Sequence, residues 1–334
     1  MKLKAPILVC SSLACMCLCT RSVEAYLHLT EEIAGRRITL HWSRFPVQYF
    51  ATNRGVPGVT PAQLQAALDR AFRTWEDVPT ASITFQSVGL TEGRPFDEDG
   101  LNTLGFLDRP DLEGVLGAAG WVIDQVTGEI LESDVFFNSR SSWSVAGAGE
   151  SGKYDLESVA VHEVGHLLGL DHSGLGQVEV GPGVGRVIAS EAVMFPVALT
   201  PGTITGRRLK ADDIAGASDL YPDGNFRGAT GRIQGRVRLD GRGVFGAHVA
   251  ALNAKTGTLI AGFSQNELGE FVVAGLEPGL YVLRVEPIDD GPVDSFFSQP
   301  ALVEVNFKTS YFGRLVIAPR GGSTSSFDIQ VQPK

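Results

Sequence analysis

The 334-residue chain is poor in cysteine, and its four cysteines all lie near the start, at Cys10, Cys15, Cys17 and Cys19. No cysteine follows them. This absence excludes disulfide bonds from the rest of the chain, because a disulfide needs two thiols. The stability of that part must therefore come from other interactions.

The first 25 residues predict export. Lys2 and Lys4 form a basic start, and a mostly apolar run follows from Pro6 to Cys19. Val23-Glu24-Ala25 then places small residues at the two positions that determine cleavage by a signal peptidase. We expect residues 1–25 to be a signal peptide, cleaved after Ala25, and the mature protein to be secreted.

Two other interpretations of this segment stay open. A membrane anchor is one, although the apolar run is shorter than the roughly 20 residues that a spanning helix needs. Lipid attachment at Cys15 is the other, because Ser12-Leu13-Ala14-Cys15 faintly resembles a bacterial lipobox. In that case the protein would be exported but anchored.

The chain also lacks an excess of basic residues. Its formal net charge is -10, with 28 Lys and Arg against 38 Asp and Glu. Residues 1–25 carry three basic side chains and one acidic one, so their removal lowers the charge of the mature chain to -12. Such a chain repels phosphates, which excludes nucleic acid as a partner. No later apolar run is long enough to cross a bilayer, so we expect no membrane partner after cleavage.

The pattern of the chain changes near residue 222. Up to Tyr221 short strand-like runs alternate with two helical stretches, whereas from Gly231 only strand-like runs between turn residues follow. Pro222 to Gly228 forms a turn-rich linker between them. We predict a first domain over residues 26–224, able to fold by itself, and a second over residues 225–334.

Two helices are expected in the first domain. Thr60 and Pro61 are a good N-cap and first residue for a helix from Pro61 to Val78. Asp155 can cap a second helix over Leu156 to Leu168, which Gly169 would end. Arg37–Tyr49 is expected to be a strand that leads into a loop, and further strands are expected at Asn102–Leu107, Val115–Ile123 and Ile130–Asn138.

The second domain reads as a β-sandwich, since its strand-like runs are short and separated by Gly and Pro. The expected strands are Arg232–Arg238, Ala247–Asn253, Leu259–Phe263, Glu270–Ala274, Leu280–Val285, Ala301–Asn306, Arg314–Ile317 and Phe327–Val331.

The chemistry-bearing motif is HEVGHLLGLDH, residues 162–172. His162 and His166 are four residues apart on the predicted helix, so they project from one face and can share a cation. Gly169 can adopt the left-handed conformation that turns the chain back and brings His172 to the same point. Three imidazoles with an open fourth position are typical of a catalytic zinc site.

Glu163 directly follows the first of these histidines. Its carboxylate is expected beside the open position without binding the metal. There it can accept a proton from zinc-activated water and pass it to a leaving amine, so we predict that Glu163 is the general base.

The extended motif resembles that of the metzincin peptidases, and the string from Tyr154 to Ser173 is similar to matrixins, particularly bacterial ones. The resemblance implies a metzincin-like catalytic domain, a twisted mixed sheet with an active-site helix, and hence an α+β chain whose second domain is an all-β sandwich. It also implies that Met194, in Glu191-Ala192-Val193-Met194-Phe195-Pro196, forms the Met-turn below the zinc ligands. Arg208 to Pro222 resembles the closing helix of that domain.

The residues outside the motif limit which metal ions other than one catalytic zinc the chain can bind. Outside the motif the mature chain has only His28, His41 and His248, none where animal matrixins keep a second zinc, so one zinc is expected. Residues 132–138 resemble the strand that precedes the active-site helix, and Asp134 there is a possible ligand of a structural ion, with calcium left open. The 21 residues between His172 and Met194 exceed the usual matrixin spacing, and Gly174 to Gly185 is interpreted as an inserted loop.

The C-terminal region resembles a second family, the carboxypeptidase regulatory-like β-sandwiches, over Gly231 to Val285. Its landmarks are turn glycines and alternating apolar residues, which indicate a fold but no site. This domain could bind a surface or a partner, or act as a spacer.

Together these features predict a secreted zinc metalloendopeptidase whose substrates are proteins or peptides. One alternative is a zinc-binding but inactive adhesin-like protein, against which the intact Glu163 argues. Another is a zinc peptidase with a distant glutamate as third ligand, which Gly169 and His172 disfavour.

Overall fold

The structure is a computed structural model that describes residues 26–334 apart from 27, 35, 182–183, 197–199 and 289–292. The expected signal peptide and the alternative lipid site at Cys15 lie outside the described residues. Among the described residues, no helix has the length and apolar character needed to span a membrane.

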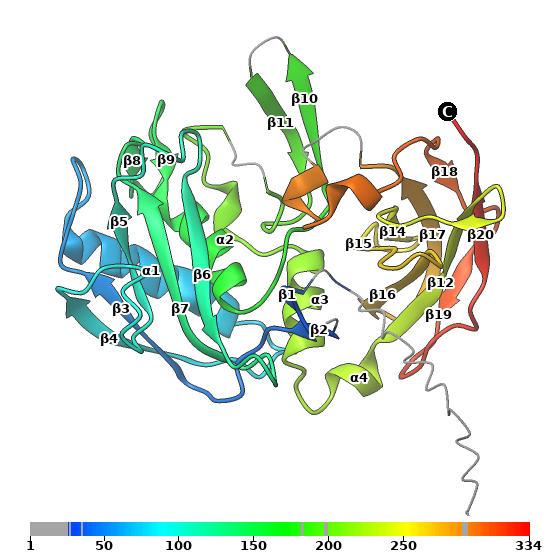
Figure 1. Cartoon of the computed structure of the whole chain (residues 1–334), viewed down its shortest axis with the longest axis horizontal. Coiled ribbons are helices and arrows are strands. Elements are labelled where there is room, and N and C mark those ends of the chain that lie inside the picture. Colours follow the sequence, from blue (N-terminus) through cyan, green and yellow to red (C-terminus); the bar gives the residue numbers. More distant parts are fainter. Residues whose placement is uncertain (1–25, 27, 35, 182–183, 197–199, 289–292) are drawn as a thin grey trace, which may run out of the picture.

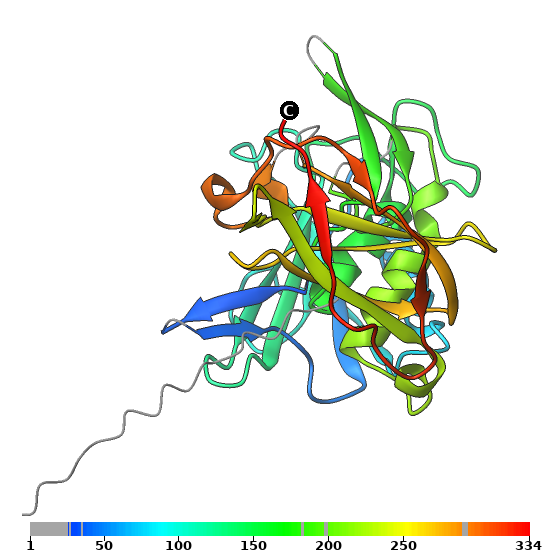
Figure 2. The same ribbon diagram turned by 90° about the vertical axis from the view of Figure 1, so that its right-hand side faces the viewer.

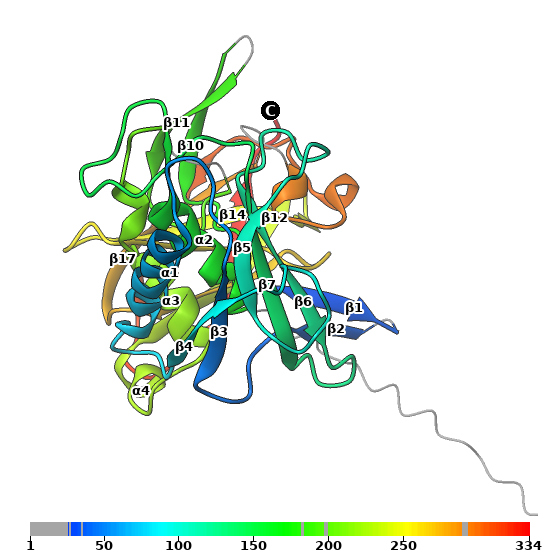
Figure 3. The same cartoon turned by 90° about the vertical axis from the view of Figure 1, so that its left-hand side faces the viewer.

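A five-stranded sheet organises the first half of the chain, in the order β4-β3-β5-β7-β6. Its strands are β3 (Val47–Thr52), β4 (Phe85–Thr91), β5 (Thr103–Leu107), β6 (Gly117–Ile123) and β7 (Ile130–Asn138). Strands β3, β4, β5 and β7 are parallel, whereas β6 runs antiparallel to β7 at one edge (Figures 1 and 3). A mixed α+β arrangement is therefore confirmed for this part.

Two helices cover one face of this sheet: α1 (Pro61–Glu76) and α2 (Leu156–Leu167) (Figure 3). Both begin as predicted, because Thr60 caps α1 in a capping box and the Asp155 carboxylate accepts the Ser158 N–H at 2.9 Å. Gly169 follows α2 with φ +99°, which confirms its expected left-handed conformation.

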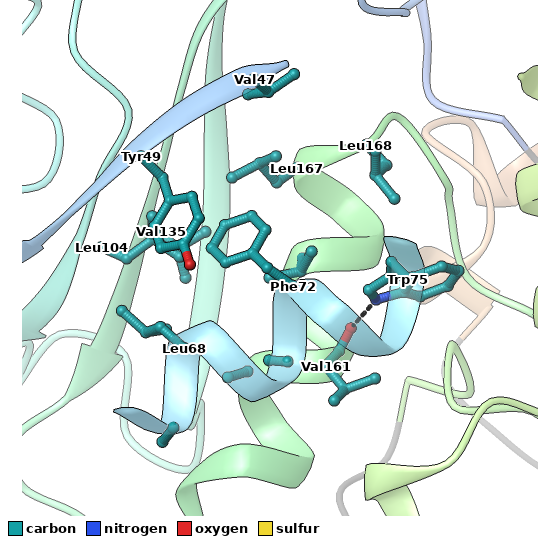
Figure 4. Packing of buried hydrophobic residues seen from close by; sticks show 14 of the residues in the cluster. Val47, Tyr49, Leu68, Phe72, Trp75, Leu104, Val135, Val161, Leu167 and Leu168 are labelled. Atoms are coloured by element: carbon teal, nitrogen blue, oxygen red, sulfur yellow. Dashed lines mark hydrogen bonds between the residues drawn. The ribbon is translucent and has the colours of Figure 1, made fainter. Parts of the chain in front are cut away.

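The core between the helices and the sheet combines aliphatic and aromatic side chains (Figure 4). Phe72 of α1 stacks on Tyr49 of β3, with ring centroids 3.8 Å apart. The Trp75 indole donates a 2.8 Å hydrogen bond to the carbonyl of Val161, which ties α1 to α2. Helix α2 is thus packed between α1 and the sheet.

Shorter elements complete the first half. They are β1 (Thr30–Ile33), β2 (Arg36–Thr39), β8 (Trp143–Ser144), β9 (Tyr154–Asp155), the 3-10 helix η1 (Thr205–Arg207), α3 (Ala211–Leu220) and α4 (Phe226–Ala229). The turn-rich linker predicted at Pro222 to Gly228 contains the start of α4, and Phe226 is buried there.

The insertion expected over Gly174 to Gly185 contains regular secondary structure. This stretch contains β10 (Gly176–Gly181), which pairs antiparallel with β11 (Val184–Ser190) in a hairpin that projects from the body of the molecule (Figures 1 and 2). In the sequence Val178 and Val180 alternate with Gln177 and Glu179, a pattern typical of a strand, and the backbone pairs Val178 with Val187, so strand pairing outweighs the effect of the glycines.

The second half of the chain, residues 231–334, consists of two sheets and is called the C-terminal β region below. One sheet contains β12 (Gly231–Leu239), β13 (Arg242–Gly243), β16 (Glu270–Leu276) and β20 (Asp328–Val331). The other contains β14 (His248–Asn253), β15 (Leu259–Phe263), β17 (Gly279–Glu286), β18 (Ser310–Tyr311) and β19 (Val316–Ala318). Buried residues of both sheets form one apolar cluster, and Figure 2 shows the region face on.

One predicted strand is wrong. Ala301–Asn306 begins in the 3-10 helix η3 (Pro300–Leu302), and its remaining residues belong to no strand among the described residues. Pro300 favours the first turn of a helix, and Glu304 makes a single backbone hydrogen bond to Phe245 rather than a ladder.

Helix α3 packs against both halves. Ala217 belongs to the core of the first half, whereas Ala215 belongs to the cluster of the C-terminal β region. The Asp212 carboxylate accepts the Ala261 N–H of β15 at 2.8 Å and bonds the Ser173 hydroxyl at 2.5 Å. The two halves therefore share a buried contact directly beside His172.

Candidate metal centre

Three histidine side chains converge where α2 ends. His162 and His166 lie one turn apart on α2, and His172 comes back from the chain beyond Gly169. The Nε2 atom of His166 lies 3.1 Å from the Nε2 atoms of both His162 and His172. Among the described residues, this is the one group of three or more His, Cys, Asp or Glu side chains close enough to hold a metal ion.

The hydrogen bonds of the three rings fix their tautomers. Each Nδ1 atom lies beside a backbone carbonyl: His162 beside Val193 at 2.8 Å, His166 beside Leu170 at 2.8 Å and His172 beside Ser295 at 2.6 Å. A carbonyl can only accept, so each Nδ1 carries the proton and each Nε2 presents its lone pair. Burial also lowers the pKa of His162 to about 4, which keeps this ring neutral at neutral pH.

These donors fit a zinc ion. Three lone pairs that point at one another repel, and a cation between them removes the repulsion. With zinc–nitrogen bonds of about 2.0–2.1 Å and tetrahedral angles, two ligand nitrogens lie about 3.3 Å apart, close to the 3.1 Å seen for His166 and its neighbours. The donor set of neutral imidazoles is also one that zinc prefers.

Glu163 lies in the same cleft as the histidines and is only 4% exposed. Its Oε2 atom is buried and has no hydrogen-bond partner among the described residues. Burial raises the pKa of Glu163 to about 8, and a cation at the histidines would counteract this shift by favouring the carboxylate. An orphaned buried carboxylate of this kind is costly for stability and indicates a functional role.

Gly117 of β6 is a neighbour of Glu163 that sequence reasoning missed. A Cβ atom at this position would lie 2.9 Å from Glu163 Oε1 and 2.9 Å from the carbonyl oxygen of Phe136. Only a glycine therefore leaves room for the carboxylate against the strand.

Met194, the residue that the resemblance assigns to the Met-turn, is fully buried. A Cβ atom on Gly165 would lie 2.3 Å from its sulfur, so the glycine in the middle of the motif makes space for this side chain. The backbone of the turn is held by Asp213 of α3, whose carboxylate accepts the N–H groups of Val193 at 2.8 Å and Met194 at 3.0 Å.

We expect Asp213→Ala to destabilise the protein strongly. The Asp213 carboxylate also accepts the Lys210 N–H at 2.8 Å, so the substitution leaves three backbone N–H groups without their acceptor. The Met194 bond is buried and the other two are partly buried, so at about 1–3 kcal/mol for a buried unsatisfied group the free energy of unfolding should fall by about 2–3 kcal/mol. Urea denaturation of Asp213→Ala and of the exposed control Asp77→Ala tests this. Equal midpoints for the two variants would show that Asp213 does not hold the turn.

The histidines open onto a cleft of about 770 Å³. The edge strand β6 forms one wall, and the segment after Met194, including Phe195 and Pro196, forms another. Asp294 and Ser295 of the C-terminal β region also line it. This last contribution was not foreseen, because no sequence signal links Ser295 to His172.

Asp134, expected as a possible ion ligand, lies on β7 away from the histidine group. Its two carboxylate oxygens accept the backbone N–H groups of Phe96 at 2.5 Å and Thr103 at 2.6 Å. Burial raises the pKa of Asp134 to about 6. These bonds give Asp134 a role in anchoring the chain before β5, and a structural ion there remains a prediction.

Comparisons with known proteins agree with this geometry. The sequence pattern of the family described as Matrixin matches residues 41–222. The metalloendoproteinase 2-MMP of Arabidopsis thaliana is 31% identical over 182 residues, which cover 50% of this chain and 40% of that protein. Karilysin of Tannerella forsythia is 27% identical over 195 residues, or 54% of this chain and 33% of that protein. The chain thus spans less than half the length of these relatives.

Proposed function

The chain belongs to the matrixin family, and we propose that it is a secreted zinc-dependent endopeptidase with Glu163 as its general base. The observation that carries the proposal is the convergence of three Nε2 lone pairs beside the buried Glu163 carboxylate, whose Oε2 atom has no partner within the described part of the chain. Secretion rests on the signal-peptide pattern of residues 1–25.

In this proposal His162, His166 and His172 hold the zinc, and Met194 supports them from below. When bound, zinc supplies Lewis-acid chemistry: it polarises the scissile carbonyl and lowers the pKa of water. Glu163 accepts the proton of the attacking water and donates it to the leaving amine. Its burial against Gly117 keeps the carboxylate at one place in the cleft.

A peptide substrate is proposed to lie along β6. This strand pairs with β7 on one side only and lines the cleft on the other. The free backbone groups of such an edge can bind an extended peptide as an additional strand. The scissile bond of the substrate would then lie next to the three histidines.

The domain assignments are part of the proposal. We propose a catalytic domain over residues 26–224, and a carboxypeptidase regulatory-like β-sandwich over residues 225–334 that could bind a surface or partner. The two sheets with their shared core support the second assignment.

The decisive experiment is digestion of a peptide library by the purified chain 26–334, with products identified by mass spectrometry. Cleavage within peptides that stops on zinc chelation and returns with added zinc is the expected result. A zinc-loaded chain that cuts no peptide would instead support the zinc-binding, inactive alternative.

We expect Gly117→Ala to lower kcat/KM by about 10- to 100-fold, because the added methyl group displaces the Glu163 carboxylate and a shift near 1 Å is that costly. Zinc content should not change, since Glu163 is not a ligand. Gly147→Ala is the matched control, because a Cβ atom there meets nothing within 4 Å. Full activity of Gly117→Ala would mean that the carboxylate does not need this contact.

A further inference from the structure

Of the three carbonyls that fix the histidine rings, one comes from a distant part of the chain. Val193 and Leu170 lie in the first half, whereas Ser295, the acceptor for His172 Nδ1, lies 123 positions further along and belongs to the C-terminal β region. The 2.6 Å distance is the shortest of the three. Acceptors of this kind set the orientation of a ligand ring and raise its basicity.

Ser295 is held in place by its own segment. It ends the 3-10 helix η2 (Val293–Ser295), and the N–H groups of Phe296 and Phe297 both donate to the Val293 carbonyl, at 3.0 and 3.1 Å. The Phe296 and Phe297 side chains are each 6% exposed. The Phe296 ring also faces the His172 ring edge-on, with centroids 6.4 Å apart.

This segment is anchored to both halves of the molecule. Phe296 and Phe297 share an apolar cluster with Phe263 of β15 and with Phe195, the residue after Met194. Close by, a Cβ atom on Gly174 would lie 2.8 Å from both the His248 and the Phe263 rings. A glycine at this position therefore lets the chain that follows His172 pack directly against the C-terminal β region.

We infer that the C-terminal β region completes the metal centre, with the Ser295 carbonyl as the group that positions His172. This inference deepens the proposed function and rests on it for the identity of the metal. It gives the region a role other than that of a spacer. It also runs against the expectation that residues 26–224 work alone, because that part would keep only two of the three acceptors.

The test weakens one carbonyl and leaves every side chain in place. Replacing Phe296 by phenyllactic acid in the full chain 26–334 turns the Ser295–Phe296 amide into an ester, whose carbonyl is a poorer acceptor. The matched control is phenyllactic acid at Phe297. Both replacements remove one N–H that donates to Val293, but only the first alters the Ser295 carbonyl.

Zinc affinity is measured by competition with a chromophoric chelator, and cobalt-substituted protein is compared by visible absorption. We expect the ester at Phe296 to weaken zinc binding about tenfold, at the low end of the effect of removing an outer-shell partner, and to change the cobalt spectrum. The ester at Phe297 should leave both unchanged. Equal zinc affinities and spectra for the two esters would overturn the inference.

A genetically simpler pair gives a second reading. Phe296→Ala should bind zinc more weakly than the parent, whereas Phe296→Leu should bind it as tightly as the parent. Phe312→Ala, which lies elsewhere in the C-terminal β region, should also have the zinc affinity of the parent. Melting curves of the metal-free proteins identify any variant that has lost its fold. A parent that binds zinc but cleaves nothing would contradict the proposed function alone. Equal zinc affinities and cobalt spectra for the two esters would contradict this inference alone.

Discussion

Glu163→Gln should keep one zinc per chain and lose nearly all turnover. The substitution keeps the size of the side chain, so the packing against Gly117 is preserved. Gln cannot accept a proton near neutral pH, and loss of a general base costs about 10²- to 10⁴-fold in rate. We therefore expect kcat/KM to fall by that factor while elemental analysis still finds zinc.

Glu157→Gln is the matched control for this variant. The control removes a carboxylate from the same helix, and Glu157 is also buried. Unlike Glu163, Glu157 pairs with Arg70 at 2.6 Å and does not face the cleft. Its kcat/KM should stay near that of the parent at a temperature where both are folded. If Glu163→Gln cleaves peptides as fast as Glu157→Gln, another group must be the base.

The part of the site that could be predicted is the part fixed by local spacing. His162, His166 and the turn at Gly169 follow from helix geometry, which depends on neighbours only a few residues away. Local sequence also predicts the helix caps at Thr60 and Asp155, and it predicts β7 with its observed bounds, Ile130–Asn138. Here the local preferences of the sequence agree with the fold.

The groups that position the site residues were found only in the structure. Asp213 contacts Met194 across 19 positions, and Ser295 contacts His172 across 123. Such contacts depend on how whole elements pack against each other, and they cannot be predicted from the residue types alone. The hairpin within the insertion at Gly174–Gly185 and the wrong strand at Ala301–Asn306 have a related cause: both runs have ambiguous local preferences, and the presence or absence of a pairing strand decided their conformation.

His166→Ala should abolish zinc binding altogether. His166 is the central member of the histidine group, because its Nε2 atom lies 3.1 Å from both other Nε2 atoms, and its loss leaves two imidazoles. A ligand that binds only the folded state stabilises it, by about 4 kcal/mol at a concentration a thousandfold above its Kd. The parent should therefore melt at a markedly higher temperature with zinc than without it, and the variant should show no such difference and no peptidase activity.

The control for this experiment is His41→Ala, which removes a histidine that lies outside the group of three and contacts the Thr39 carbonyl instead. It should keep both the zinc-dependent rise in melting temperature and the activity, so a general effect of losing an imidazole is separated from loss of the site. Without metal, the melting temperature of His166→Ala should be close to that of the parent or slightly higher. The reason is that, without metal, the Nε2 lone pair of His166 is repelled by those of His162 and His172, and the substitution removes this repulsion. A zinc-dependent rise that persists in His166→Ala would place the bound zinc elsewhere, and the convergence of the three rings would then have no part in binding it.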